Sequence, residues 1–95
     1  MLNILHLIRC SAFSSNQLEN CLETILLGDT IVLLDDGCYS INHSSLLDIT
    51  AKGNVFVVTE HIIARGIEPS LNINRISLTE LTELMFSHQS VVTWQ

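Results

Sequence analysis

The chain has 95 residues, of which 47% are hydrophobic and 15% are charged, and its net charge at pH 7 is −6. This length supports one hydrophobic core, so we expect a single domain over residues 1–95. The basic residues are few and scattered, which argues against direct binding of nucleic acid, because phosphate contacts need clustered cations. We expect no membrane span and no signal peptide, since no apolar run approaches about 20 residues and the N-terminal segment lacks a basic region and a cleavage site.

The low charge and the cysteine count point to partner subunits and to a reducing compartment. The charged fraction is well below the roughly 25% of an average globular protein, so part of the apolar surface of this small domain should face another subunit. The three cysteines are an odd number without the spacing of a disulfide framework or a metal site. We therefore expect reduced thiols in the cytoplasm and no cofactor or metal.

The apolar pattern predicts strands that alternate with helices. A continuous run such as Ile31–Leu34 is typical of a strand covered on both faces of a parallel sheet, whereas apolar recurrence every three or four residues predicts a helix. In chain order, we expect a strand over residues 2–8, a helix over 18–26, a strand over 31–34, a short helix over 45–51, a strand over 55–58, a short helix over 60–65, a strand over 75–77, a helix with Leu81, Leu84 and Met85 on its apolar face, and a strand over 91–94. This order predicts an α/β fold, a small three-layer domain with a mainly parallel sheet of about four to five strands flanked by helices.

Local signals mark the ends of two helices. Ser14 and Gln17 have the spacing of a capping box before the first helix, and Ser77 and Glu80 repeat that spacing before the last helix. Gly28 is placed to end the first helix. These signals predict where the two longer helices begin and where the first one stops.

Polar and thiol side chains follow the first two strands. Functional groups in parallel sheets gather at the carboxyl ends of the strands, and Arg9, Cys10 and the run Asp35–Cys38 stand there. Asp35 and Asp36 could act as paired carboxylates in acid–base chemistry. They could equally cap a turn in which Gly37 supplies an unusual backbone angle, and we favour the turn.

Cys21 lies on the apolar face of the first helix and has two interpretations. It could be a nucleophile that holds and passes on a persulfide, or a buried small hydrophobe, which is the commoner situation. Cys10 and Cys38 could lie close together, but without a CxxC motif two unrelated thiols are the simpler interpretation. His61 and Arg65 share one helix face, which we interpret as a solvent or interface surface.

Several short motifs occur in order along nearly the whole chain. They are Gly28–Asp29 before the second strand, Asp36–Gly37 after it, Ile63–Gly66 after the third strand, and Trp94, which we expect to be a packing anchor. Together with the chain length and the order of elements, they resemble the TusB/DsrH family of sulfur-relay subunits. Each match is short, and their common order makes the combination specific.

The resemblance implies a role inside a larger assembly. Family members form a heterohexamer from three related α/β subunits, so the implied partners are TusC-like and TusD-like subunits. In the TusBCD form, persulfide sulfur comes from a TusA-like carrier and passes through a TusE-like acceptor to the enzyme that 2-thiolates wobble uridine in tRNA. The essential cysteine belongs to the TusD-type subunit, so the chain is expected to be a non-catalytic subunit rather than an enzyme by itself.

The alternative within the same family is a DsrH-type sulfurtransferase subunit of a DsrEFH complex in sulfur oxidation. DsrH-type members carry a cysteine in the first helix, and Cys21 stands at the matching position. TusB-type members need not have this cysteine. Cys21 is therefore the candidate catalytic residue, as a persulfide carrier, under this alternative.

Overall fold

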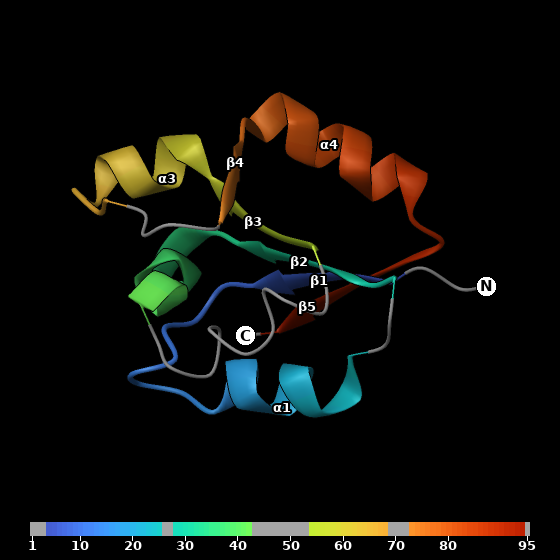
Figure 1. The fold of residues 1–95 in the computed structure, drawn as a ribbon, viewed down its shortest axis with the longest axis horizontal. Coiled ribbons are helices and arrows are strands. Elements are labelled where there is room, and N and C mark those ends of the chain that lie inside the picture. Colours follow the sequence, from blue (N-terminus) through green and yellow to red (C-terminus); the bar gives the residue numbers. More distant parts are fainter. Residues whose placement is uncertain (1–3, 26–27, 43–53, 69–72, 95) are drawn as a thin grey trace.

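The computed structural model describes residues 4–25, 28–42, 54–68 and 73–94. These residues form a five-stranded sheet in which all neighbouring strands are parallel (Figure 1). The strands, in their order across the sheet, are β4 (Asn74–Ile76), β3 (Asn54–Val58), β2 (Thr30–Leu33), β1 (Ile4–Ile8) and β5 (Ser90–Trp94). The helices are α1 (Gln17–Thr24), the 3-10 helix η1 (Asp35–Asn42), α3 (Thr59–Ala64) and α4 (Leu78–Ser87). The expected α/β fold is confirmed, with a sheet that is parallel throughout.

Helices cover both faces of this sheet, with α1 and η1 on one face and α4 on the other (Figure 1). Successive side chains of a strand point to opposite faces, so the central strands supply two separate cores. In β2, Ile31 and Leu33 pack in the core that contains Cys21 of α1, whereas Val32 packs in the core that contains Leu81 of α4. The continuous apolar run in this strand is therefore explained by burial on both sides.

Most of the predicted elements begin and end within one or two residues of an element of the structure. The short helix expected over residues 45–51 lies outside the described residues. The capping box before α4 is confirmed, because the Glu80 main-chain N–H donates to Ser77 Oγ and the Ser77 N–H donates to the Glu80 carboxylate, both at 3.1 Å. The 3-10 helix η1 was not expected from the pattern of apolar residues.

The predicted capping box before α1 is wrong. The helix begins at Gln17, and its N-cap residue Asn16 makes no side-chain capping bond. The Ser14 hydroxyl instead donates to the carbonyl oxygen of Ser11 (3.3 Å), which holds it in the preceding turn. The Gln17 main-chain N–H donates to Ser15 Oγ (3.2 Å). Serine side chains readily make such local bonds, and here they compete with the cap.

The first helix also ends earlier than expected. Ile25 already has an extended backbone (ψ 139°), and the Thr24 hydroxyl donates to the carbonyl oxygen of Cys21 at 2.9 Å. That bond uses a carbonyl at the helix end, where main-chain partners are lacking. Because α1 ends at Thr24, Gly28 (φ 95°) lies in the turn that leads into β2 and does not end the helix.

Candidate functional site

Cys21, the candidate persulfide carrier, lies inside the core between α1 and the sheet. Its side chain is 0% exposed and packs in the cluster that contains Leu18, Ile31 and Leu33. Burial raises the pKa of the Cys21 thiol to about 12, and the negative charge of Asp29 adds to this rise. The thiolate is the nucleophilic form of cysteine, so at neutral pH this conformation holds Cys21 as a protonated, enclosed thiol.

The other two thiols follow β1 and β2, as the sequence indicated. Cys38 is buried in η1, and its thiol donates to the carbonyl oxygen of Leu33 (Sγ to O, 3.7 Å). Burial raises the pKa of Cys38 to about 11, although the nearby positive charge of Arg65 opposes the rise. Cys10 is partly exposed, and all three cysteines are free thiols. No disulfide therefore joins Cys10 to Cys38.

The turn after β2 is built by Asp35 and Gly37 in roles that differ from the expectation. Asp35, not Gly37, has the positive φ, at 50°. Gly37 is needed because its backbone lies against β1, where an added Cβ would overlap the carbonyl oxygen of Ile8. The same oxygen accepts the main-chain N–H of Leu34 (3.1 Å), so the turn is fixed to the end of β1. The interpretation of Asp35–Asp36 as a turn is confirmed, and the assignment of the unusual angle to Gly37 is wrong.

Charged side chains at the carboxyl edge of the sheet pair with one another. Arg9 Nε lies 2.7 Å from Asp35 Oδ2, and Arg65 Nε lies 3.3 Å from Asp36 Oδ1. The Asp35 main-chain N–H donates to His61 Nδ1 (2.9 Å), which leaves the proton of a neutral imidazole on Nε2. His61 and Arg65 thus connect α3 to η1 rather than facing solvent. The two carboxylates are held by cations, an arrangement that suits a fixed turn better than proton transfer.

A buried polar chain links β5, β1 and the start of β2. Trp94 Nε1–H donates to His6 Nδ1 (3.1 Å), so His6 Nε2 carries the proton and donates to Asp29 Oδ2 (3.1 Å). Asp29 Oδ1 accepts the main-chain N–H of Ile4 (3.2 Å). The expectation that Trp94 is a packing anchor is confirmed, because it also packs against the core that contains Cys21. The sequence analysis did not predict these hydrogen bonds, although a lone histidine in an apolar strand indicates a buried polar partner.

The described residues include neither a metal-ligand cluster nor a membrane-spanning helix. Within residues 4–25, 28–42, 54–68 and 73–94, no three His, Cys, Asp or Glu side chains are grouped so that they could hold a metal ion. The described helices include none with the length and apolar composition to cross a membrane.

The fold and these sites define a class of small, all-parallel α/β domains with enclosed thiols and an internally paired carboxyl edge. The family model described as DsrH like protein matches residues 10–91, so the chain belongs to the DsrH family. In structure it is similar to protein Tm0979 from Thermotoga maritima, solved by solution NMR, with a TM-score of 0.66, 17% identity, and coverage of 88% of this chain and 92% of that one. No curated protein matches the chain.

Family membership gives the chain a general role as a sulfur-relay subunit. Members of the DsrH family normally act within a multi-subunit sulfur-relay complex. At 17% identity, the likeness to Tm0979 supports the fold and no functional detail. The position of Cys21 in α1 matches the resemblance described above, and its role as a sulfur carrier stays a prediction.

Proposed function

We propose that the chain is a non-catalytic subunit of a TusBCD-type complex that transfers persulfide sulfur for 2-thiolation of tRNA wobble uridine. The family assignment supports a sulfur-relay subunit. The single observation that favours a structural role is the state of Cys21, which is 0% exposed and has its pKa raised to about 12. A carrier thiol must ionise and reach a donor sulfur, and this thiol does neither in the described conformation.

The surface supports a role in assembly. Several large apolar side chains are strongly exposed, among them Phe13 (68%), Ile63 (71%) and Phe86 (86%). Exposed aromatic residues are common at protein–protein contacts. We propose that such surfaces contact TusC-like and TusD-like subunits, and that a TusA-like carrier and a TusE-like acceptor bind the assembled complex in the cytoplasm. The net charge of −6 favours protein partners over tRNA as direct contacts of this chain.

The alternative is a DsrH-type sulfurtransferase subunit in sulfur oxidation, with Cys21 as persulfide carrier. Its support is the position of Cys21 in the first helix. It requires α1 to move away from the sheet, because Cys21 packs among Leu18 and Ile31. Local opening of a short surface helix is physically reasonable, so the alternative has a definite structural cost and a definite test.

The test is the 2-thiouridine content of tRNA in a strain that lacks this chain. We expect deletion to abolish thiolation and both the wild-type chain and Cys21→Ser to restore it. Cys10→Ser serves as a matched control for loss of a thiol, because Cys10 is partly exposed while Cys21 is buried. Normal tRNA thiolation in the deletion strain would refute the proposal. If Cys10→Ser restores thiolation and Cys21→Ser does not, the sulfur-carrier role would belong to this chain.

A further inference from the structure

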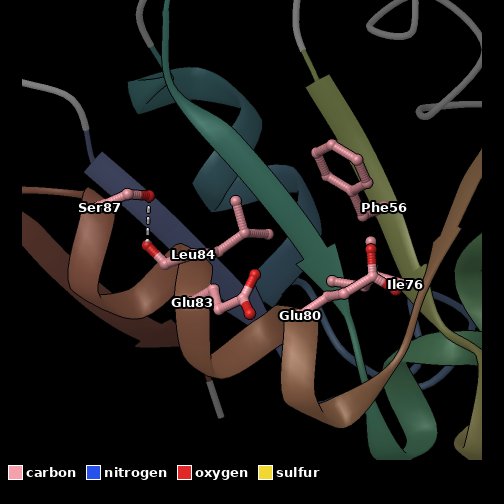
Figure 2. Close-up of a pocket in the computed structure, with 6 residues that line it drawn as sticks. All are labelled: Phe56, Ile76, Glu80, Glu83, Leu84 and Ser87. Carbon is pink, nitrogen blue, oxygen red and sulfur yellow. Dashed lines mark hydrogen bonds between the residues drawn. The ribbon is translucent and has the colours of Figure 1, made fainter.

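A groove with a cavity volume of about 340 Å³ lies between α4 and the strands β3 and β4. Figure 2 shows Glu80, Glu83, Leu84 and Ser87 along the helix, with Phe56 and Ile76 on the two strands. Ligand pockets in proteins begin at about 300 Å³, so the groove has room for a single long side chain rather than for a large cofactor. It lies on the α4 face of the sheet, whereas Cys21 and Cys38 pack in the core on the opposite face.

The floor of the groove is apolar and its rim is acidic. Phe56 and Leu84 are only partly buried and line the floor with the buried Ile76. Glu80 and Glu83 supply carboxylates at the exposed rim. One oxygen of Glu80 accepts the Ser77 N–H (3.1 Å) in the capping box. A ligand for this groove therefore combines an apolar stem with a positive charge.

The described part of the chain does not neutralise this rim. The ion pairs recorded among the described residues involve Asp29, Asp35 and Asp36, and none involves Glu80 or Glu83. Arg75 is the nearest arginine in sequence, but it precedes Ile76 in β4, and adjacent strand residues point to opposite faces. Ile76 packs on the α4 face, so the Arg75 side chain leaves the sheet on the other face.

We propose that the groove binds an arginine side chain of a partner protein. The aliphatic stem would lie on Leu84 and Ile76, and the guanidinium group would lie between the Glu83 carboxylate and the face of Phe56. Arginine forms directional bonds to carboxylates and stacks on aromatic rings, and it is enriched at protein interfaces. The net charge of −6 favours the approach of a basic segment. This docking surface does not depend on which sulfur pathway the chain serves.

The probe is a short, capped peptide, Ala-Ala-Arg-Ala-Ala, titrated into the 15N-labelled full chain and followed by amide chemical shifts. We expect saturable shifts centred on Phe56, Glu83 and Ser87. The same peptide with citrulline or norleucine in place of arginine should produce no saturable shifts there, because it lacks the charge. In Glu83→Gln, binding should weaken by about two- to fivefold, the effect expected for an exposed ion pair.

Glu23→Gln is the matched control, because Glu23 is an exposed glutamate on α1, across the sheet from the groove. It should leave the shifts at the groove unchanged. Equal weakening by both variants, or equal shifts with the citrulline peptide, would reduce the effect to general attraction by an acidic protein and overturn the proposal. Groove shifts that depend on protein concentration without any peptide would assign the groove to a second copy of the chain and would also overturn it.

Discussion

Trp94 donates a hydrogen bond from its indole Nε1 to Nδ1 of His6 (3.1 Å), 88 positions earlier in the chain. The centroids of the two rings lie 6.2 Å apart, and β1 and β5 pair in parallel over the same region. His6 in turn donates a hydrogen bond from Nε2 to the buried carboxylate of Asp29. The bond thus ties the last strand to the first strand and to the start of β2.

Replacing Trp94 by phenylalanine should show what this bond contributes. The variant keeps an aromatic ring but leaves Nδ1 of the buried His6 without a donor, so we expect the free energy of unfolding to fall by about 1–3 kcal/mol. Urea unfolding gives the value. Thr93→Val on the same strand is the control, because Thr93 is exposed and a surface change should alter stability by less than about 0.5 kcal/mol. An equal loss in both variants would show that the bond to His6 contributes nothing.

The buried thiols predict a loss of stability at alkaline pH. Cysteine has a reference pKa of 9.0, and burial raises the pKa of Cys21 to about 12 and that of Cys38 to about 11 in the folded chain. As the pH rises above 9.0, the unfolded chain releases thiol protons that the folded chain retains. Each thiol therefore lowers the free energy of unfolding by up to about 1.4 kcal/mol per pH unit, from pH 9.0 to its folded pKa.

Cys21→Ala isolates this effect from other groups that titrate at alkaline pH. We expect the drop in urea midpoint between about pH 8 and about pH 10 to be smaller in the variant than in the wild type. Cys10→Ala is the control, since Cys10 is partly exposed, and it should leave the slope close to that of the wild type. A wild-type slope in Cys21→Ala would mean that the thiol ionises as easily in the folded chain as in the unfolded one.

Glycine is required at positions 37 and 66 for different physical reasons. Gly37→Ala places a methyl group on the carbonyl oxygen of Ile8, so β1 and η1 must separate, and we expect a loss of more than about 3 kcal/mol. Gly66 has a φ of 63° and open space around it, so Gly66→Ala carries only the left-handed backbone penalty of about 1–2 kcal/mol. Thermal unfolding of both variants ranks them, and a greater loss with Gly66→Ala would contradict this account of the turn.

The two serines that resemble N-caps should differ in the same way. Ser77→Ala removes the observed cap of α4 and should lower stability by about 1 kcal/mol. Ser14→Ala removes a hydroxyl whose recorded bond to a described residue stays within a turn, and we expect a change of less than about 0.5 kcal/mol. Urea unfolding under one set of conditions compares them. Equal losses would mean that Ser14 supports α1 in a way that the bond to Ser11 does not explain.

The periodicity of the sequence was enough to predict the five strands and the helices α1, α3 and α4, but not the 3-10 helix η1. Runs such as Ile31–Leu34 are apolar because both faces of the sheet are covered, and this signal is local. The capping pattern succeeded at Ser77 and failed at Ser14, because the same spacing also suits a serine that bonds within a turn. The spacing of the residues permits a cap, but whether the cap forms depends on the hydrogen bonds that the neighbouring residues offer.

The site was less predictable, because its contacts join residues distant in the chain. The clash that requires glycine at position 37 comes from Ile8, and the partners of Asp35 are Arg9 and His61. None of these pairs shares a local pattern. The position of Cys21 on an apolar helix face did indicate burial, but the size of the rise in its pKa depends on the packed core and on a carboxylate from another element.

The central claim is that this chain supports sulfur transfer without carrying sulfur. The most direct test is intact mass spectrometry of the co-expressed three-subunit complex after loading with a persulfide donor, with the mass of each subunit measured separately and Cys21→Ser as the control. We predict that added sulfur appears on a partner subunit and that this chain keeps its unmodified mass. Added sulfur on this chain that disappears in Cys21→Ser would contradict the claim and identify Cys21 as a residue that carries sulfur.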